Sequence, residues 1–141
     1  VNISKTFLQI LPIKLTSNEF ILNKFKIIVD KVLELNENFQ RILSNSINLI
    51  EAKFEHIENN RKINTWYKLD FKEFISELNK GSVSLTIGEE AEWMQYFNEQ
   101  KQKAEELKAK IDKTDREIDQ MVYELYGLTD EEIEIVENAT K

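Results

Sequence analysis

Three runs of carboxylates and a lone histidine are the side chains of this sequence that could support acid–base or metal chemistry. They are Glu89-Glu90, Glu105-Glu106, Asp130-Glu131-Glu132 and His56. Each run falls in the first turn or on the solvated face of an expected helix, where carboxylates occur without any ligand. The chain has no Cys and no second His that could complete a site with His56. We therefore predict no catalytic, cofactor-binding or metal-ligating residue in this sequence.

Nucleotide-binding chemistry has little support in the sequence either. Its three isolated glycines cannot form a phosphate-cradling loop, and neither GxGxxG nor GxxxxGK[ST] occurs. Four aromatic side chains could stack on bases, namely Trp66, Tyr67, Phe71 and Phe74. Because their spacing is helical and they lie beside an expected linker, we interpret them as core residues.

Basic residues could contact phosphate groups instead. Residues 1–80 hold 12 Lys and Arg against 10 Asp and Glu, whereas residues 81–141 hold 7 against 16. The acidic second half disfavours a phosphate backbone, so a nucleic-acid contact should come from the first half. Arg61 and Lys62 lie in a segment without apolar residues, where a turn could present them to a phosphate. A mixed solvated surface is the simpler explanation for most of these cations.

The elements that would position these groups are predicted to be helices. The composition is 41% hydrophobic and 32% charged with three Gly and one Pro, which fits neither disorder nor a loop-rich β sandwich. Two apolar seams with alternating spacings of three and four residues predict long packed helices. The first comprises Ile21, Phe25, Ile28, Val32, Leu35, Phe39, Ile42, Ser46 and Leu49, and the second Phe97, Gln100, Ala104, Leu107, Ile111, Thr114, Ile118, Met121 and Leu125. Polar seam residues such as Gln100 and Thr114 either fix the register or lie at a wet edge.

Four capping boxes and one glycine predict where the helices begin and end. The boxes pair Thr16 with Glu19, Asp70 with Glu73, Thr86 with Glu89, and Thr129 with Glu132. They predict a long helix from residue 16 to about 57 and a short one over 71–79. A second long helix follows over 89–126, about 57 Å in length at ~1.5 Å per residue, and a last short helix comes after residue 129. Gly127 supplies a left-handed C-cap to the second long helix.

We therefore predict a mainly α fold, in which two long helices form an antiparallel coiled-coil hairpin with short helices between and after them. Residues 1–15 would add a short extended or β arm, because Pro12 is excluded from a helix interior and from a central strand. The expected organisation is this arm followed by one helical module at 16–141, a size that suits a single domain.

Targeting segments are not expected in this chain. No stretch approaches the roughly 18 to 20 uncharged apolar residues of a membrane span, and no signal peptide begins it. The sequence thus predicts a soluble, cytoplasmic protein without a membrane partner. Val1 stands where a primary translation product would have Met, so we expect a fragment of a longer chain or a processed product.

One long segment and four short blocks carry a resemblance to a known family. The segment is IDKTDREIDQMVYELYGLTDEEIEIVE at 111–137, and the blocks are LPI at 11–13, IVDKVLEL at 28–35, WYKLDFKEF at 66–74 and EWM at 92–94. Together they resemble the C-terminal region of adenine-specific DNA methyltransferases of restriction-modification systems, called the TaqI-like C-terminal specificity domain. The resemblance extends over nearly the whole chain.

The resemblance implies a part of an enzyme rather than a complete one. In that family an upstream domain binds S-adenosylmethionine and flips the target adenine into an Asn-Pro-Pro-Tyr/Phe pocket, a motif that this chain lacks. Double-stranded DNA and the upstream methyltransferase domain become the implied partners, and endonuclease activity is often present in the same enzymes. The arm at 1–15 would end the target-recognition part, and the helices would be its spacer. The candidates for phosphate contacts are then Lys14, Arg61, Lys62 and Lys68.

Two functions remain open from the sequence. The first is a C-terminal helical module of a DNA-target-recognition region, which would position recognition and catalytic domains on double-stranded DNA. The second is a coiled-coil assembly module that binds a protein partner or its own copy, as a homo-oligomer, without touching DNA. The acidic second half of the chain fits the second function well.

Overall fold

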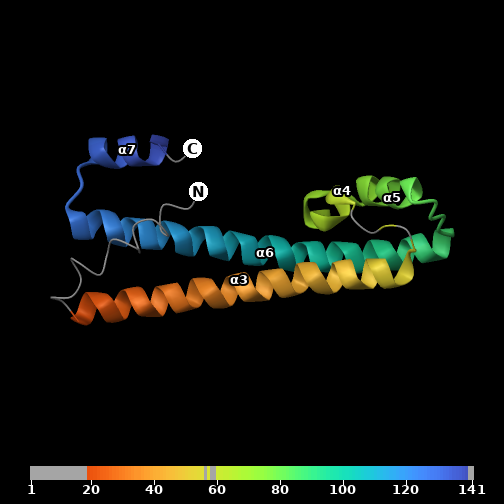
Figure 1. Cartoon of the computed structure of the whole chain (residues 1–141), viewed down its shortest axis with the longest axis horizontal. Coiled ribbons are helices and arrows are strands. Elements are labelled where there is room, and N and C mark those ends of the chain that lie inside the picture. Colours follow the sequence, from red (N-terminus) through yellow and green to blue (C-terminus); the bar gives the residue numbers. More distant parts are fainter. Residues whose placement is uncertain (1–18, 56, 58–59, 140–141) are drawn as a thin grey trace. The chain divides into compact units, whose positions relative to one another are not determined.

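The computed structural model describes residues 19–55, 57 and 60–139, and within these ranges the chain is helical with no strand. The helices in chain order are α3 (Glu19–Lys53), α4 (Arg61–Asn64), the 3-10 helix η1 (Trp66–Lys68), α5 (Phe71–Lys80), α6 (Ile87–Tyr126) and α7 (Asp130–Ala139) (Figure 1). The prediction of a mainly α chain with two long helices is therefore confirmed. The predicted arm at 1–15 and the box formed by Thr16 lie outside the described residues.

The chain divides into two compact units, and each long helix contributes to both of them. The described part of unit 1 consists of residues 19–34 and 110–139, which hold the first part of α3, the last part of α6, and α7. Unit 2 is Leu35–Ala109 and holds the rest of both long helices together with α4, η1 and α5.

The core of unit 1 is mainly aliphatic. Phe25 of α3 packs with Ile118 and Val122 of α6, and all three side chains are buried. Half-buried apolar residues of the same two helices surround them, namely Ile21, Ile28, Val29, Val32, Met121, Leu125 and Tyr126. The seam pattern of the sequence is what places these side chains on facing sides of the two helices.

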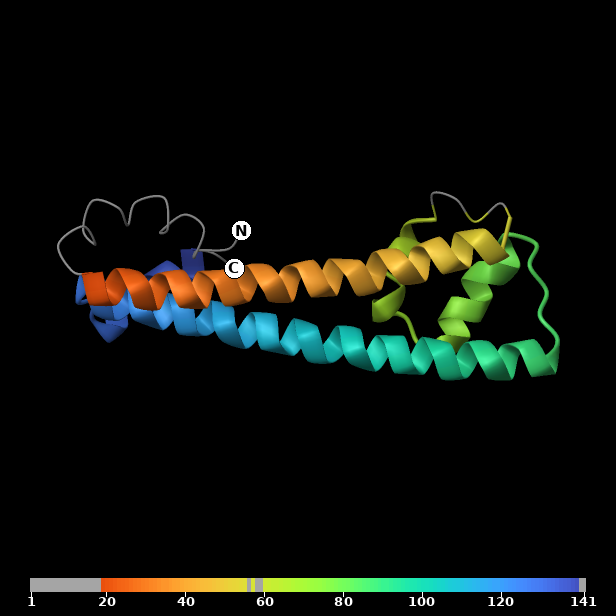
Figure 2. The ribbon, with the colours of Figure 1, turned by 90° about the horizontal axis from the view of Figure 1, so that it is seen from below.

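The core of unit 2 is a cluster of aromatic rings. Phe97 of α6 stacks on Phe74 of α5 at 5.0 Å between ring centroids and meets Trp66 of η1 edge-on at 5.8 Å. Phe54, beyond the last turn of α3, reaches Trp93 of α6 at 5.1 Å. Figures 1 and 2 show α4 and α5 lying against one side of the pair formed by the end of α3 and the start of α6.

The two long helices run in opposite directions where they pack in unit 2. Ser46 Oγ lies 3.4 Å from Tyr96 Oη, whereas Phe54, later in the chain, meets Trp93, earlier in α6. Every predicted seam position on both helices is buried or half-buried. Of the polar seam residues, Thr114 donates its hydroxyl to Lys110 O of its own helix at 2.8 Å. This bond satisfies a buried hydroxyl without crossing to α3.

The predicted helix ends are largely confirmed. Asp70 and Glu73 form a reciprocal capping box, with Glu73 N donating to Asp70 Oδ1 at 2.7 Å and Asp70 N donating to Glu73 Oε2 at 2.9 Å. Thr86 and Glu89 form another box at the start of α6, and Thr129 Oγ1 accepts from Glu132 N at 3.3 Å. These bonds satisfy first-turn amides that have no partner within the helix.

Two helix ends differ from the prediction. α3 ends at Lys53, about four residues before the expected end near residue 57. The following residues contribute buried Phe54 and Ile57 to the core of unit 2, so burial of these side chains outweighs continuation of the helix. α6 begins at Ile87 rather than Glu89, directly after its cap Thr86. Among the described residues no helix is long and apolar enough to cross a membrane.

Candidate nucleic-acid interface

Three of the four predicted phosphate contacts lie in one short stretch of unit 2. Arg61 and Lys62 form the first turn of α4, and Lys68 ends η1, whereas Lys14 lies outside the described residues. Asn60 caps α4 by accepting from Lys62 N at 3.0 Å and Ile63 N at 3.3 Å. Ile63 is buried, so the turn is anchored to the core of unit 2 while its cations face outward.

Lys62 is tied to a nearly buried carboxylate of α5. Its Nζ lies 3.2 Å from Glu77 Oε1, which Lys80 Nζ also contacts at 2.6 Å. Asn60 Nδ2 donates to Glu77 Oε2 at 3.3 Å. The hydrogen bond from Lys80, followed by those from Asn60 and Lys62, lowers the pKa of Glu77 to about 2 against the opposing effect of burial. This network joins α4 to α5 and uses Lys62 for structure.

Arg61 and Lys68 are the cations of this stretch that remain available. Both are exposed, and neither lies within 4.0 Å of a carboxylate among the described residues. Lys68 Nζ lies 5.8 Å from the centroid of the Tyr67 ring, a cation–π distance that leaves its outer face open to solvent.

The neighbouring aromatic side chains serve as core. Trp66 and Phe74 are each 1% exposed, and Tyr67 and Phe71 are half-buried. The interpretation of this group as core is therefore confirmed for its two innermost rings. Trp66 Nε1 is buried without a hydrogen-bond partner among the described residues, which is unfavourable to stability. Because the Trp66 ring itself is buried, it is not available to stack on a base.

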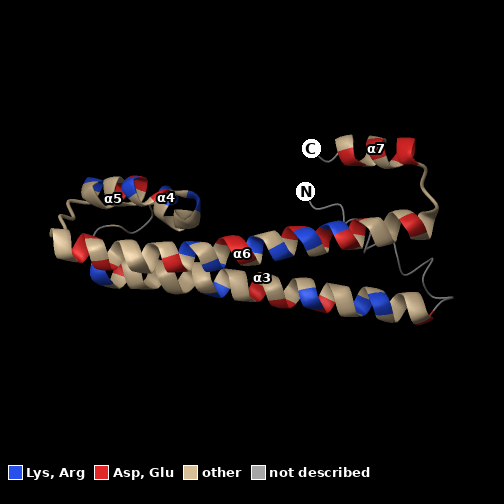
Figure 3. Ribbon diagram, turned by 180° about the vertical axis from the view of Figure 1, so that it is seen from behind, with Lys and Arg blue, Asp and Glu red and all other residues tan. Residues whose placement is uncertain are grey.

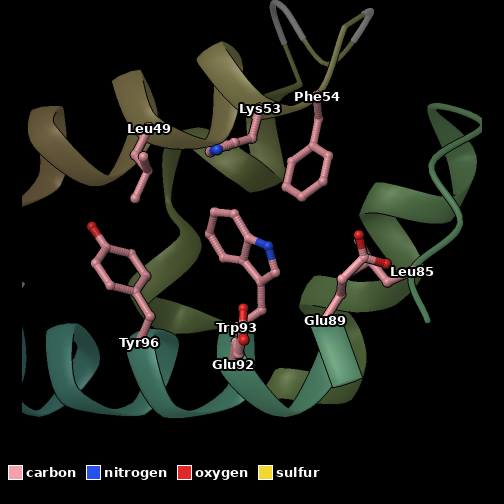
Figure 4. Close-up of a pocket in the computed structure, with 8 residues that line it drawn as sticks. All are labelled: Leu49, Lys53, Phe54, Leu85, Glu89, Glu92, Trp93 and Tyr96. Carbon is pink, nitrogen blue, oxygen red and sulfur yellow. The ribbon is translucent and has the colours of Figure 1, made fainter. Parts of the chain in front are cut away.

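A pocket of about 380 Å³ lies in unit 2 beside this core (Figure 4). Its lining residues are Leu49, Lys53, Phe54, Leu85, Glu89, Glu92, Trp93 and Tyr96. Glu89 caps α6, and the hydrogen bonds from Thr86 lower its pKa, so this carboxylate has a structural role. Among the described residues, neither Lys53 nor Glu92 lies within 4.0 Å of an oppositely charged side chain.

A second, larger concave surface lies in unit 1, and none of its lining residues was predicted as a site residue from the sequence. It is a groove of about 700 Å³ between α3 and α6. Four cations line it, Lys24 and Lys31 from α3 and Lys113 and Arg116 from α6, together with the carboxylates of Glu117 and Glu124. Figure 3 shows Lys and Arg along both α3 and α6. The seven-residue spacing of Lys24 and Lys31 beside the first seam was a signal that could have placed both on the groove.

Other site chemistry is not found in the described ranges. They contain no group of three or more His, Cys, Asp or Glu placed to hold a metal ion. His56, to which the sequence assigned no role, lies outside them.

One comparison with known proteins gives a match. A family model described as "Domain of unknown function (DUF8810)" matches residues 18–122, which is most of the chain. No match was found among curated proteins or among solved structures.

Proposed function

We propose a role in DNA recognition for this chain, which belongs to the family described as a domain of unknown function, DUF8810. The proposed role is that of a C-terminal helical part of the target-recognition region of an adenine-specific DNA methyltransferase. The module would hold recognition and catalytic parts in position on double-stranded DNA in the cytoplasm. The proposal starts from the resemblance of residues 111–137 and four shorter blocks to such enzymes.

Long packed helices suit a positioning role. We infer that α3 and α6 form an antiparallel coiled-coil hairpin, because every predicted seam position on both helices is buried or half-buried. The 35 residues of α3 extend about 52 Å at ~1.5 Å per residue, longer than the roughly 34 Å of one DNA turn. Adenine methylation needs such support because the target base must leave the stack while the flanking duplex stays in register.

The chemistry of the reaction would reside in another part of the enzyme. S-adenosylmethionine, when bound by the upstream methyltransferase domain, supplies the methyl group. The described residues offer no glycine-rich loop at the end of a strand, so no residue of this chain is assigned to that cofactor. This chain's own contribution is binding and orientation.

The structural observation that supports the proposal is the exposure of Arg61 and Lys68. They are exposed, anchored near the buried Ile63 and Trp66, and without a carboxylate partner among the described residues. Fixed cations of this kind contact phosphate oxygens and set register without reading bases.

The proposed phosphate contacts of Arg61 and Lys68 are tested by measuring binding of the full chain to a fluorescent DNA duplex. Arg61→Gln/Lys68→Gln should weaken binding and flatten the dependence of log K on log salt by up to about 1.8, which is ~0.9 per lost phosphate contact. Lys72→Gln/Lys103→Gln is the matched control, since both lysines are exposed and it removes the same charge. An unchanged salt dependence in the first variant would contradict these phosphate contacts.

The assignment of this chain to a methyltransferase is tested by reading the gene sequence upstream of the segment that encodes it. Sequencing the native gene upstream of the codon for Val1 should reveal a cofactor-binding domain with Asn-Pro-Pro-Tyr/Phe. A frame that encodes no such domain would refute the assignment to a methyltransferase. In that case the second candidate function becomes the better one.

A second candidate is the assembly module, and exposed apolar side chains on α3 favour it. Phe20 is 74% exposed, Ile27 70% and Leu33 56%. Single exposed apolar residues are common, but Phe20 and Ile27 are seven residues apart and share a face of the helix. Light scattering would show self-association under this hypothesis, and the DNA assay would show no binding at low salt.

A further inference from the structure

The groove of unit 1 presents cations along two helices. Lys24 and Lys31 are separated by seven residues, and therefore by about 10.5 Å along α3 at ~1.5 Å per residue. Lys113 and Arg116 on α6 are about 4.5 Å apart along its axis. The α3 wall therefore carries two cations and no carboxylate, and the α6 wall carries two cations beside Glu117 and Glu124.

Within the described part of the chain, these four cations form no direct ion pairs. Among the described residues, no carboxylate lies within 4.0 Å of any of the four, although Glu117 and Glu124 line the same groove. In a helix pair held by flanking charges, lysines of one helix would contact glutamates of the other. Here they do not, and cations outnumber carboxylates by four to two. The unpaired positive charge complements an anionic ligand.

Apolar side chains lie between the charges. Ile28 and Met121 are half-buried in the groove, and Ile27, which also lines it, is 70% exposed. A free phosphate ion would leave this apolar surface uncovered. A nucleic-acid strand alternates anionic phosphates with sugar carbons, so it matches both kinds of surface. The distance between Lys24 and Lys31 corresponds to about three phosphates at the ~3.4 Å rise of one strand.

We propose that the groove lined by Lys24, Lys31, Lys113 and Arg116 binds the sugar-phosphate backbone of one strand of duplex DNA. This inference rests on the proposed function and adds a second DNA contact to Arg61 and Lys68. The contact is independent of base sequence, because phosphate oxygens carry no sequence information. It would hold the enzyme in register while base edges are read elsewhere.

The test measures binding of the full chain to a labelled 20-base-pair duplex between 50 and 200 mM salt. Lys24→Gln/Lys31→Gln should flatten the slope of log K against log salt by up to about 1.8. Over this fourfold range of salt, the loss of affinity should then be about tenfold smaller than in the unmodified chain. Lys26→Gln/Lys110→Gln is the matched control, with exposed lysines of the same unit outside the groove. Lys and Gln have similar helix propensity, so both variants should stay folded.

Each outcome has a separate meaning. A flatter slope in the groove variant but not in the control supports the groove contact. Equal slopes in both, with a flatter slope in Arg61→Gln/Lys68→Gln, overturn the groove contact and leave the proposed function standing. No binding of the unmodified chain at 50 mM salt overturns both. Equal competition by polyglutamate would show general polyanion binding and overturn the assignment to duplex DNA.

Discussion

At the scale of single residues, Glu77 links the charge and the stability of unit 2. Its side chain is 7% exposed and accepts hydrogen bonds from Lys62, Lys80 and Asn60. A carboxylate this enclosed is stable as an anion only with such partners, and they bring α4 against α5. The same network explains why Lys62 is a weaker candidate for a phosphate contact than its neighbour Arg61.

Glu77 makes the stability of unit 2 depend on pH in the acidic range. Its pKa of about 2 in the folded chain is below the ordinary value of 4.5, so the unfolded chain binds the proton more readily. The stabilisation is present above about pH 4.5 and is lost as the pH falls towards 2. Glu77→Gln should therefore lower the thermal unfolding midpoint at pH 7, and the difference from the unmodified chain should shrink below pH 4.5. Circular dichroism at a series of pH values measures it.

Glu51 of α3 supplies the control for this experiment. It is an exposed carboxylate of the same unit, with no ion pair among the described residues. Glu51→Gln should change the midpoint little across the whole pH range. If Glu77→Gln gave a constant difference from pH 7 to pH 2, the network would not be acting through the charge of Glu77.

At the scale of elements, the end of α6 depends on Gly127. Its φ of 61° lies in the left-handed region, and Gly127 N donates to Glu124 O while Leu128 N donates to Tyr123 O. This is the Schellman arrangement, which satisfies the last carbonyl groups of a helix. A Cβ at this position would meet no atom within 4 Å, so the conformation alone determines its cost.

Two matched glycine substitutions should have effects of opposite sign. Gly127→Ala should destabilise the chain by about 1 kcal/mol, because an L side chain disfavours the left-handed region. Gly88→Ala, in the first turn of α6, meets no atom within 4 Å and should stabilise by up to ~1 kcal/mol. Urea unfolding of both variants measures the two values. A stabilising Gly127→Ala would contradict the capping role.

Local signals in the sequence predicted the elements well because the forces behind them are local. The boxes at Asp70 and Thr86, the seams and Gly127 each depend on residues within one or two helical turns. The end of α3 was missed because it depends on tertiary burial of Phe54 and Ile57. The short helix α4 was also missed, since its cap Asn60 lies in a segment that has no apolar pattern.

The candidate site was less predictable than the fold. Arg61 was predicted as a phosphate contact because a turn could be inferred at its position, whereas Lys68 became a candidate only with the resemblance, in the block at 66–74. The pairing of Lys62 with Glu77 joins residues 15 positions apart, and the groove brings Lys24 and Lys31 together with residues more than 80 positions later. No local pattern encodes which charges meet across such separations, so the spatial arrangement was needed.

At the scale of the whole molecule, the chain is acidic, whereas its proposed DNA contacts are local clusters of Lys and Arg. The net charge is -7, and α6 and α7 both have acidic residues in the first turn and no basic residue in the last. A chain with this net charge gains no long-range attraction to DNA. Any binding must come from local clusters such as the groove, and should be strongest at low salt, where screening is weakest.

Two cores in one chain lead to a prediction about unfolding. Phe74 is buried in the aromatic core of unit 2, and Ile118 is buried in the aliphatic core of unit 1. Phe74→Ala should cost about 3–5 kcal/mol and Ile118→Ala about 2–5 kcal/mol, because each leaves a cavity. Since each side chain packs within its own unit, amide protection should fall mainly at 35–55 and 60–109 in the first variant and mainly at 19–34 and 110–126 in the second.

Native-state hydrogen exchange distinguishes separate unfolding of the two units from unfolding of the chain as a single cooperative unit. Phe20→Ala is the control, because that side chain is 74% exposed and its removal should leave protection unchanged in both units. An equal loss of protection throughout the chain in both core variants would show that the two units unfold together. Separate losses would mean that the groove of unit 1 can open while the turn with Arg61 stays folded. The two proposed DNA contacts would then be energetically independent, and their effects on binding should add.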